Sequence, residues 1–354
     1  MLRRTFLQSI SGAAAATALA AGHDLRLGVD AYSIRAFRWK DMQLLDYCAK
    51  LGARALMLSW PGDFTSTDAG HVAAFRRRAG ELDIVVDLAI GSICPSRAPW
   101  RRPESPEEYV RSSLRAARAV GSKVVRCFLG SVEDRSGDVP FAAHVEATSK
   151  VLRAVRTEAV DLGVKVAVEN HGDFEAREMK AMIEDVGPDA VGCCLDSGNP
   201  LRVMEDPLQT LEVLGPYTVT AHMRDSVIFA HPRGAAFQWV ALGDGMIDFA
   251  RFTRRYAELC PGAAYHLEII TGRPPYIVPF LEPEFWKAFP EKRAAEFAPF
   301  LALVRNGRPF LGAMMIGGSG KQPPEYEAAL NEQQRVDLER SIAYAQQSLG
   351  FRRG

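Results

Sequence analysis

The chain has 354 residues, 47% of them hydrophobic and 24% charged, which is the composition of an ordinary globular protein with one large or two average domains. Lysine plus arginine and aspartate plus glutamate number 43 each, so the formal net charge is zero. This balance argues against nucleic acid, or an anionic membrane surface, as a general partner.

The first 22 residues have the features of an export signal. Arg3-Arg4 is followed by Phe6-Leu7 and then by an alanine-rich apolar stretch that contains the small-residue cleavage pattern Ala-Leu-Ala. The paired arginines resemble a twin-arginine signal, and the stretch is too short and too rich in alanine for a membrane span. We therefore expect the mature protein to be periplasmic or otherwise exported, without a membrane span.

From residue 25 onward, short apolar or β-branched runs alternate with amphipathic segments. Runs that end at a turn signal are typical of buried parallel strands, and the segments between them are typical of helices. The expected strands are Leu25–Val29, Ala53–Leu58, Ile84–Ala89, Lys123–Phe128, Lys165–Glu169, Val191–Leu195, Val219–Met223 and Ala264–Glu268. The clearest expected helices are Asp41–Leu51, Val72–Leu82, Pro106–Val120 and Phe141–Leu162.

Eight strands separated by helices predict an α/β fold of the (β/α)8 TIM barrel type. The alternative is a doubly wound open sheet. Such a sheet is expected to begin with a glycine-rich turn after its first strand, and Gly28-Val29-Asp30-Ala31 is not one. Six cysteines without CxxC spacing are expected to pack in the core rather than to form a disulfide framework.

Three segments exceed what an idealised barrel needs. The stretches after the third and seventh strands, Gly91–Ser105 and residues 224 to about 247, form a lid or a substrate wall, or are surface decoration. Beyond the eighth strand, helices expected near Glu284–Val304 and Pro324–Leu349 form a C-terminal helical extension, which packs either on the barrel or on a second subunit of a homo-oligomer. The expected division is a signal peptide at 1–22, a barrel at 23–290 and the extension at 291–354.

Four metal-capable side chains lie at the ends of later apolar runs, roughly one βα unit apart. They are Glu169 in KVAVE, Asp196 in VGCCLD, His222 in TVTAHM and Glu268 in AYHLE. Taken singly, such a residue is more often a helix cap, an ion-pair partner or a core histidine. Together they would meet at the C-terminal end of a barrel, where burying so much charge is costly unless a cation compensates it. The pattern therefore predicts a divalent-cation site.

The same runs resemble the signature of the xylose isomerase-like TIM-barrel superfamily, which includes sugar phosphate isomerases/epimerases, ketose 3-epimerases, inosose dehydratases and, more distantly, endonuclease IV. The resemblance spans residues 25 to about 270, and the four-ligand set is its most diagnostic part. The motifs that carry it are Val-Glu169-Asn170-His171, Leu-Asp196-Ser-Gly-Asn199, Ala-His222-Met-Arg224-Asp225, Leu-Glu268, the opening Gly28-Val-Asp-Ala-Tyr32-Ser33, and Leu242-Gly-Asp-Gly245-Met-Ile-Asp248-Phe249.

The resemblance implies one divalent metal ion, typically Mn²⁺, held by Glu169, Asp196, His222 and Glu268. Three carboxylates and one imidazole suit Mn²⁺, with Mg²⁺, Co²⁺ and Zn²⁺ as alternatives. The cation would bind the carbonyl and hydroxyl oxygens of a sugar, acidify the carbon-bound proton between them and stabilise an enediolate. In the epimerases of this family the two glutamates also exchange protons, which assigns catalysis to Glu169 and Glu268.

Four further residues are candidate substrate contacts: Tyr32, His171, Asn199 and Arg224. His171 either contacts the substrate or steadies its loop. Asn199 stands three residues after Asp196, where the epimerases commonly carry histidine, and this departure points to a different substrate. Arg224 is suited to a hydroxyl or a carboxylate, and Asp225 to orienting Arg224 or His222.

The leading hypothesis is a metal-dependent sugar isomerase or epimerase, and export favours a small, non-phosphorylated sugar as substrate. A lyase or dehydratase of keto-sugars, keto-glycosides or inososes would use the same enediolate and then expel a β-substituent. Endonuclease IV-like DNA repair is disfavoured because it needs three zinc ions and extra histidines, one of them at the position of Asn199. A non-catalytic sugar-binding protein would not need two flanking glutamates.

Overall fold

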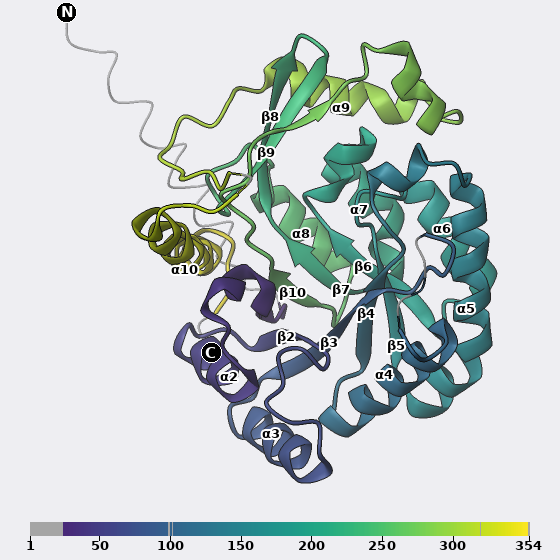
Figure 1. The fold of residues 1–354 in the computed structure, drawn as a ribbon. Coiled ribbons are helices and arrows are strands. Elements are labelled where there is room, and N and C mark those ends of the chain that lie inside the picture. Colours follow the sequence, from purple (N-terminus) through teal and green to yellow (C-terminus); the bar gives the residue numbers. More distant parts are fainter. Residues whose placement is uncertain (1–23, 98–99, 101, 319, 353–354) are drawn as a thin grey trace, which may run out of the picture.

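The computed structural model describes residues 24–97, 100, 102–318 and 320–352 (Figure 1). The export signal expected at residues 1–22 lies outside this part of the chain. Within it, no helix is long and apolar enough to cross a lipid bilayer.

Eight parallel strands close into a barrel, so the predicted TIM barrel is confirmed and the open sheet is wrong. Each strand overlaps its predicted run. The order around the barrel follows the chain, and the last strand closes the barrel by pairing with the first. The strands are β1 (Leu27–Asp30), β2 (Ala55–Ser59), β3 (Val85–Ser92), β4 (Val124–Phe128), β5 (Lys165–Glu169), β6 (Val191–Asp196), β7 (Thr218–Met223) and β10 (Ala264–Leu267).

Helices cover the outside of the barrel (Figure 1). They are α2 (Asp41–Lys50), α3 (Ala69–Glu81), α4 (Pro106–Val120), α5 (Phe141–Leu162), α6 (Ala176–Val186), α7 (Pro207–Leu214) and α8 (Phe249–Leu259). Local signals fix several ends: Ser105 caps α4 ahead of Pro106, and Gly121 ends it in a left-handed conformation. Two short 3₁₀ helices, η1 (Ala31–Phe37) and η3 (Asn199–Val203), follow β1 and β6 and lie beside the site described below.

The stretch after β7 forms a β-hairpin instead of an irregular loop. Strands β8 (Asp225–His231) and β9 (Gly234–Val240) pair antiparallel, and β11 (Tyr276–Val278) adds a third strand beside β9. The sequence alone predicts only a long connection at residues 224–247. The hairpin rises from the C-terminal end of the barrel, where TIM-barrel sites form (Figure 1).

The C-terminal extension packs on the barrel of the same chain. The expected helix at 284–304 divides into η5 (Pro283–Ala288) and α9 (Ala294–Asn306), and Pro290 lies in the break. Helix α9 packs on β8 through a second hydrophobic core, whereas α10 (Pro324–Ser348) lies beside η1 (Figure 1). The proposed boundary at 290 therefore cuts through that second core, which includes Phe289 and Phe300.

All six cysteines are buried free thiols, in agreement with the predicted packing role. Burial raises the pKa of Cys48, Cys127 and Cys260 to about 12. These thiols are therefore protonated at neutral pH and behave as small apolar side chains.

Candidate active site

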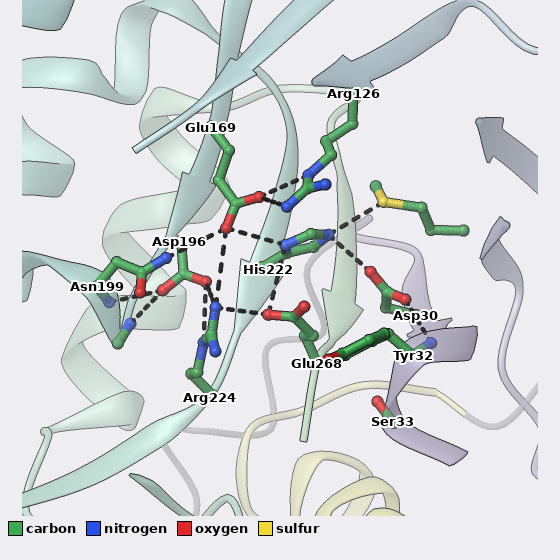
Figure 2. A network of polar contacts seen from close by, with 12 residues as sticks. Asp30, Tyr32, Ser33, Arg126, Glu169, Asp196, Asn199, His222, Arg224 and Glu268 are labelled. Atoms are coloured by element: carbon green, nitrogen blue, oxygen red, sulfur yellow. Dashed lines mark hydrogen bonds and ion pairs between the residues drawn. The ribbon is translucent and has the colours of Figure 1, made fainter. Parts of the chain in front are cut away.

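The four predicted metal ligands meet at the C-terminal end of the barrel (Figure 2). One donor atom of each side chain lies within 4.8 Å of the others, and all four side chains are buried. Parallel register places Asp196 of β6 beside His222 of β7. Glu169 ends β5, and Glu268 directly follows β10. The closure of the barrel, rather than proximity in sequence, creates the cluster.

Polar contacts fix the end of β6 against its neighbours. The Asn170 side chain accepts the N–H of Asp196 at 2.7 Å and donates to the Asp196 carbonyl at 2.9 Å. Asp196 Oδ1 accepts the N–H groups of Gly198 and Asn199, both at 2.7 Å. One carboxylate oxygen of Asp196 is thus held by the start of η3, and Oδ2 is directed at the cluster.

A hydroxyl from η1 holds the backbone on both sides of Glu268. Ser33 Oγ donates to the carbonyl of Leu267 at 3.1 Å and accepts the N–H of Ile269 at 2.9 Å. Figure 2 shows Ser33 and Tyr32 on the same side of the cluster as Glu268. The opening segment of the barrel therefore supports the last ligand in the chain.

Two arginine side chains bind the carboxylates of the cluster. Arg126 in β4 donates two N–H groups to Glu169 Oε2, one of them at 2.5 Å. Arg224 Nε donates to Asp196 Oδ2 at 2.9 Å, and one terminal nitrogen of Arg224 lies 2.5 Å from Glu268 Oε2. Figure 2 shows the Arg224 guanidinium between these two carboxylates. The arginines neutralise part of the negative charge that the barrel buries here.

Carboxylates face both nitrogens of the His222 ring. Nε2 lies 2.9 Å from Asp30 Oδ2, whereas Nδ1 lies 3.5 Å from Glu169 Oε1 and 3.6 Å from Glu268 Oε2. Burial lowers the pKa of His222, but Glu268 and Glu169 outweigh burial and hold this pKa well above its ordinary value. A histidine that binds a metal ion is neutral, so a cation would displace the proton.

The surroundings give the two glutamates different pKa values. Burial favours the protonated form of Glu169, but Arg126 and then His222 outweigh burial and hold its pKa well below the usual range. Burial raises the pKa of Glu268 above its usual value, and Arg224 and His222 only reduce this rise. Two carboxyl groups whose pKa values are separated in this way can divide the roles of base and acid.

The donor set fits a divalent cation. His222 Nδ1 is buried and has no hydrogen-bond partner among the described residues, and the carboxylate oxygens around it are ligands for a hard or borderline cation. Cys194 lies close by, but burial raises its pKa well above the ordinary value and keeps the thiol protonated. A cation would compete with the Arg224 guanidinium for Asp196 and Glu268.

A cavity of about 360 Å³ opens onto the cluster, within the size range of small-molecule sites. The predicted substrate contacts that line it are Tyr32, His171, Asn199 and Arg224. Asn199 Nδ2 also donates to Glu169 Oε1 at 3.2 Å. His171 Nδ1 donates to the carbonyl of Gly130 at 2.7 Å, and its ring stacks on Phe128, so this side chain steadies its loop. Contact with a substrate stays a prediction for all four residues.

Asp225 organises a loop instead of orienting Arg224 or His222. Its carboxylate accepts four backbone N–H groups at 2.7 to 3.3 Å, from Ser226, Gly243, Gly245 and Ile247. These bonds hold the segment that follows β9 against the start of β8. Burial raises the pKa of Asp225 to about 7, even though the four backbone donors favour its ionised form.

Ten of the residues that line this cavity were not predicted from the sequence, among them Asp30, Arg126, Arg202, Trp239, Arg273 and Tyr276. Two of them left a signal in the sequence. Asp30 ends the apolar run LGVD, the same pattern that identified the four ligands, and Arg126 is the lone charge in the strand VVRCF. The others gave no signal, since the hairpin and the loops that carry them reach the cavity only through tertiary structure.

Comparison with known proteins agrees with this architecture. The family model for the xylose isomerase-like TIM barrel matches residues 45–287. The 3-oxo-isoapionate decarboxylase of Pectobacterium atrosepticum is 22% identical over 214 residues, which cover 58% of this chain and 69% of that protein.

Among solved structures, a D-psicose 3-epimerase with D-fructose superposes with a TM-score of 0.58 at 15% identity, over 92% of this chain and 100% of that one. The IolI protein with a bound zinc atom superposes with a TM-score of 0.53 at 15% identity, over 79% of this chain and 98% of that one. Identities this low show a shared fold alone. Because the family model spans more than half of the sequence, the chain belongs to the xylose isomerase-like TIM barrel family.

Proposed function

We propose that this protein is a divalent-metal-dependent isomerase or epimerase that acts on a sugar by proton transfer at a carbon next to a carbonyl. The observation that carries the proposal is the convergence of three carboxylates and one imidazole, within 4.8 Å of one another, next to a cavity of small-molecule size. The sugar-epimerase structures of the same fold support it.

The metal ion would be held by Glu169, Asp196, His222 and Glu268, with Mn²⁺ as the preferred ion and Mg²⁺, Co²⁺ or Zn²⁺ as alternatives. When bound, it would polarise a carbonyl and an adjacent hydroxyl of the sugar and so acidify the hydrogen on the carbon between them. The IolI structure with zinc supports metal binding in this fold.

The chain's own residues would move the proton. Glu169 and Glu268 come from β5 and from the end of β10, which are not neighbours in the barrel, so they reach the cavity floor from different sides. Arg126 binds Oε2 of Glu169, so proton exchange would use Oε1, to which Asn199 Nδ2 also donates. Glu169 and Glu268 would exchange the proton with the substrate carbon, one as base and the other as acid.

The other predicted contacts would orient the sugar. Asn199 and Arg224 line the cavity next to the cluster and carry amide and guanidinium donors for hydroxyl oxygens. His171 and Tyr32 line the same cavity. Export of the mature protein, proposed from residues 1–22, would favour a non-phosphorylated substrate.

A lyase is the second candidate, and the 3-oxo-isoapionate decarboxylase relative favours it. In decarboxylation of a 3-oxo acid, the bond between the α-carbon and the carboxylate breaks and CO₂ leaves. The electron pair of that bond forms an enolate, and an acid then gives a proton to the α-carbon. The same cation site and the same Glu268 serve both reactions, because each passes through an enolate. Release of CO₂ identifies the lyase.

Hydrogen exchange tests the proposal. The Mn²⁺-loaded protein is incubated in D₂O with free ketoses, keto-glycosides, inososes and 3-oxo sugar acids, and substrate deuteration is followed by NMR. We expect deuterium at one carbon next to the carbonyl, and at least about a hundred-fold slower exchange in Glu268→Gln, the size of effect typical of a lost acid–base group.

Glu325→Gln is the matched control, because Glu325 is exposed on α10 and does not line the cavity. Exchange at the wild-type rate in Glu268→Gln would remove Glu268 from the mechanism. Absence of both exchange and CO₂ release over the whole panel would contradict the proposed reaction class.

A further inference from the structure

Two arginines line the cavity above the metal-capable cluster and bind no carboxylate among the described residues. They are Arg202 in η3 and Arg273, which lies just before β11. Neither side chain has a hydrogen bond or an ion pair within 4 Å in the described part of the chain, and Arg202 Nε is buried without a partner. This contrasts with Arg126 and Arg224 below them, which are both bound to carboxylates.

The Arg202 side chain is held in place by aromatic rings. Its guanidinium carbon lies 4.5 Å from the ring centre of Tyr276 and 5.4 Å from that of Trp239. Its aliphatic part crosses Gly172, where an added Cβ would lie 2.4 Å from Arg202 Cδ. The charge is therefore oriented before any ligand arrives, which lowers the entropic cost of binding one.

Arg273 is exposed and its backbone is fixed to the hairpin. Gln238 Nε2 of β9 donates to the Arg273 carbonyl at 2.9 Å. Arg35 of η1 is close enough for the two positive charges to interact: burial lowers the pKa of Arg35, and the charge of Arg273 adds to this effect. Arg202 interacts electrostatically with the carboxylate of Glu133 but forms no ion pair with it. Arg273 therefore lies near a second positive charge, and a bound anion would reduce the repulsion between the two.

The cavity has two chemically different ends. Its floor reaches the metal-capable cluster through Glu268, and this cluster suits the carbonyl and hydroxyl oxygens of a sugar bound to a cation. Its rim carries the guanidinium groups of Arg202 and Arg273. Trp239 lies between rim and floor, because the Arg224 guanidinium carbon on the floor side lies 4.4 Å from its ring centre. A substrate that satisfies both ends has a keto-sugar part and an anionic part.

We infer that the substrate is a sugar acid, a polyhydroxy oxo acid whose carboxylate binds Arg202 and Arg273 and whose carbonyl lies at the metal-capable cluster. This inference rests on the proposed function and narrows its substrate class. A planar carboxylate matches the guanidinium fork. Phosphate sites usually add backbone N–H donors, and the N–H groups of Gly198 and Asn199 at the start of η3 are already bound to Asp196.

The inference is tested by binding without turnover. Isothermal titration calorimetry of the Mn²⁺-loaded protein compares three probes with one carbon skeleton: D-gluconate, D-glucitol and D-glucitol 6-phosphate. We expect D-gluconate to bind at least about ten-fold more tightly than D-glucitol, the usual effect of a charge-assisted hydrogen bond. We expect Arg202→Gln and Arg273→Gln each to remove most of this preference.

Arg118→Gln, on the exposed face of α4, is the matched control and should keep the preference. Arg273 is exposed, so Arg273→Gln should fold normally. This variant keeps the inference testable if Arg202→Gln is unstable. Equal binding of D-gluconate and D-glucitol, or a preference that survives in both cavity variants, overturns the inference. Tighter binding of the phosphate also overturns it. None of these results affects the Glu268 exchange assay, so failure of the inference and failure of the proposed function are separable.

Discussion

At the scale of single residues, the guanidinium of Arg224 offsets part of the negative charge of the cluster. Its guanidinium contacts Asp196 and lies 2.5 Å from Glu268 Oε2, so it occupies two of the four side chains that would bind a cation. The same guanidinium forms a cation–π contact with Trp239, whose ring centre lies 4.4 Å from the guanidinium carbon. Arg224 therefore stabilises the cluster in the absence of a metal ion and competes with the ion for its ligands.

Replacing Arg224 with glutamine should strengthen metal binding and weaken catalysis. Removal of the competing guanidinium frees the oxygens of Asp196 and Glu268 and leaves more negative charge near the ion, so we expect Mn²⁺ affinity to rise by about ten-fold. Deuterium exchange should become slower because a donor to the substrate is lost. Calorimetric titration with Mn²⁺ measures the affinity, and Arg118→Gln serves as control. Weaker Mn²⁺ binding in Arg224→Gln would show that this arginine supports the metal site.

At the scale of elements, the segment after β9 depends on Gly245, which lets the backbone approach the Asp225 carboxylate closely. Asp225 binds the N–H groups of Gly243 and Gly245 at 3.1 Å, and a Cβ on Gly245 would lie 2.0 Å from Asp225 Oδ1. Gly245→Ala should therefore break this bond set and destabilise the protein by about 1–3 kcal/mol, the cost of an overpacked site.

Urea unfolding measures that loss of stability. Gly80→Ala is the matched control, because an added Cβ at Gly80 meets nothing within 4 Å and this position lies in helix α3. There the substitution should stabilise the protein slightly, as alanine is the better helix former. Equal stability of Gly245→Ala and the wild type would mean that the loop is not held by Asp225.

A buried glutamate links η3, α6 and the C-terminal extension, and it should make stability depend on pH. Glu205 accepts the N–H of Ala176 at 3.1 Å with each oxygen and lies 3.8 Å from Lys292 Nζ, which itself lies 2.9 Å from Glu175. Burial raises the pKa of Glu205 from the ordinary 4.5 to about 7, and Lys292 only reduces this rise. The folded protein therefore keeps a proton that the unfolded chain releases.

This stabilisation is full below pH 4.5 and is lost as the pH rises through about 7. Glu205→Gln cannot ionise, so its stability relative to the wild type should increase with pH in that window, by at most about 1.4 kcal/mol per pH unit. Urea unfolding at several pH values checks the trend, with the exposed Asp161→Asn as control. A relative stability that is constant or falls with pH would contradict the assignment.

Some elements could be predicted from the sequence and others could not. The barrel strands could be predicted because each is a buried apolar run that ends at a turn, a local signal. The hairpin β8–β9 could not, since its strands follow β7 directly and one of its faces packs on α9, which lies far along the chain. The wall residue Trp239 in β9 was missed for the same reason, whereas the rim residue Arg202 lies in η3 and reaches the cavity only through tertiary structure.

At the scale of the whole molecule, barrel closure brings the two ends of a long stretch of sequence together. Ser33 in the first turn holds the backbone around Glu268, and α10 packs beside η1, so the site depends on the complete chain fold. The four ligands could be predicted from sequence because a closed parallel barrel places all its strand ends at one rim. Their arginine partners could not, as the choice of counter-charge depends on side-chain packing.

A metal ion that binds only the folded barrel should stabilise the whole molecule. Mn²⁺ at about 100 times its Kd should add about 2.7 kcal/mol to the free energy of unfolding. We expect Tm to rise with Mn²⁺ in the wild type and to return to its starting value with EDTA. Asp196→Asn should lose this rise, whereas the exposed Asp161→Asn should retain it. A rise of the same size in Asp196→Asn would place the ion elsewhere.

The most direct test of the central claim is anomalous diffraction from crystals soaked in Mn²⁺. The account predicts one anomalous peak at the C-terminal end of the barrel, about 2.2 Å from donor atoms of Glu169, Asp196, His222 and Glu268, with the Arg224 guanidinium moved away from Asp196. A peak at another place, or no peak at this cluster while Arg224 keeps its contacts with both carboxylates, would contradict it.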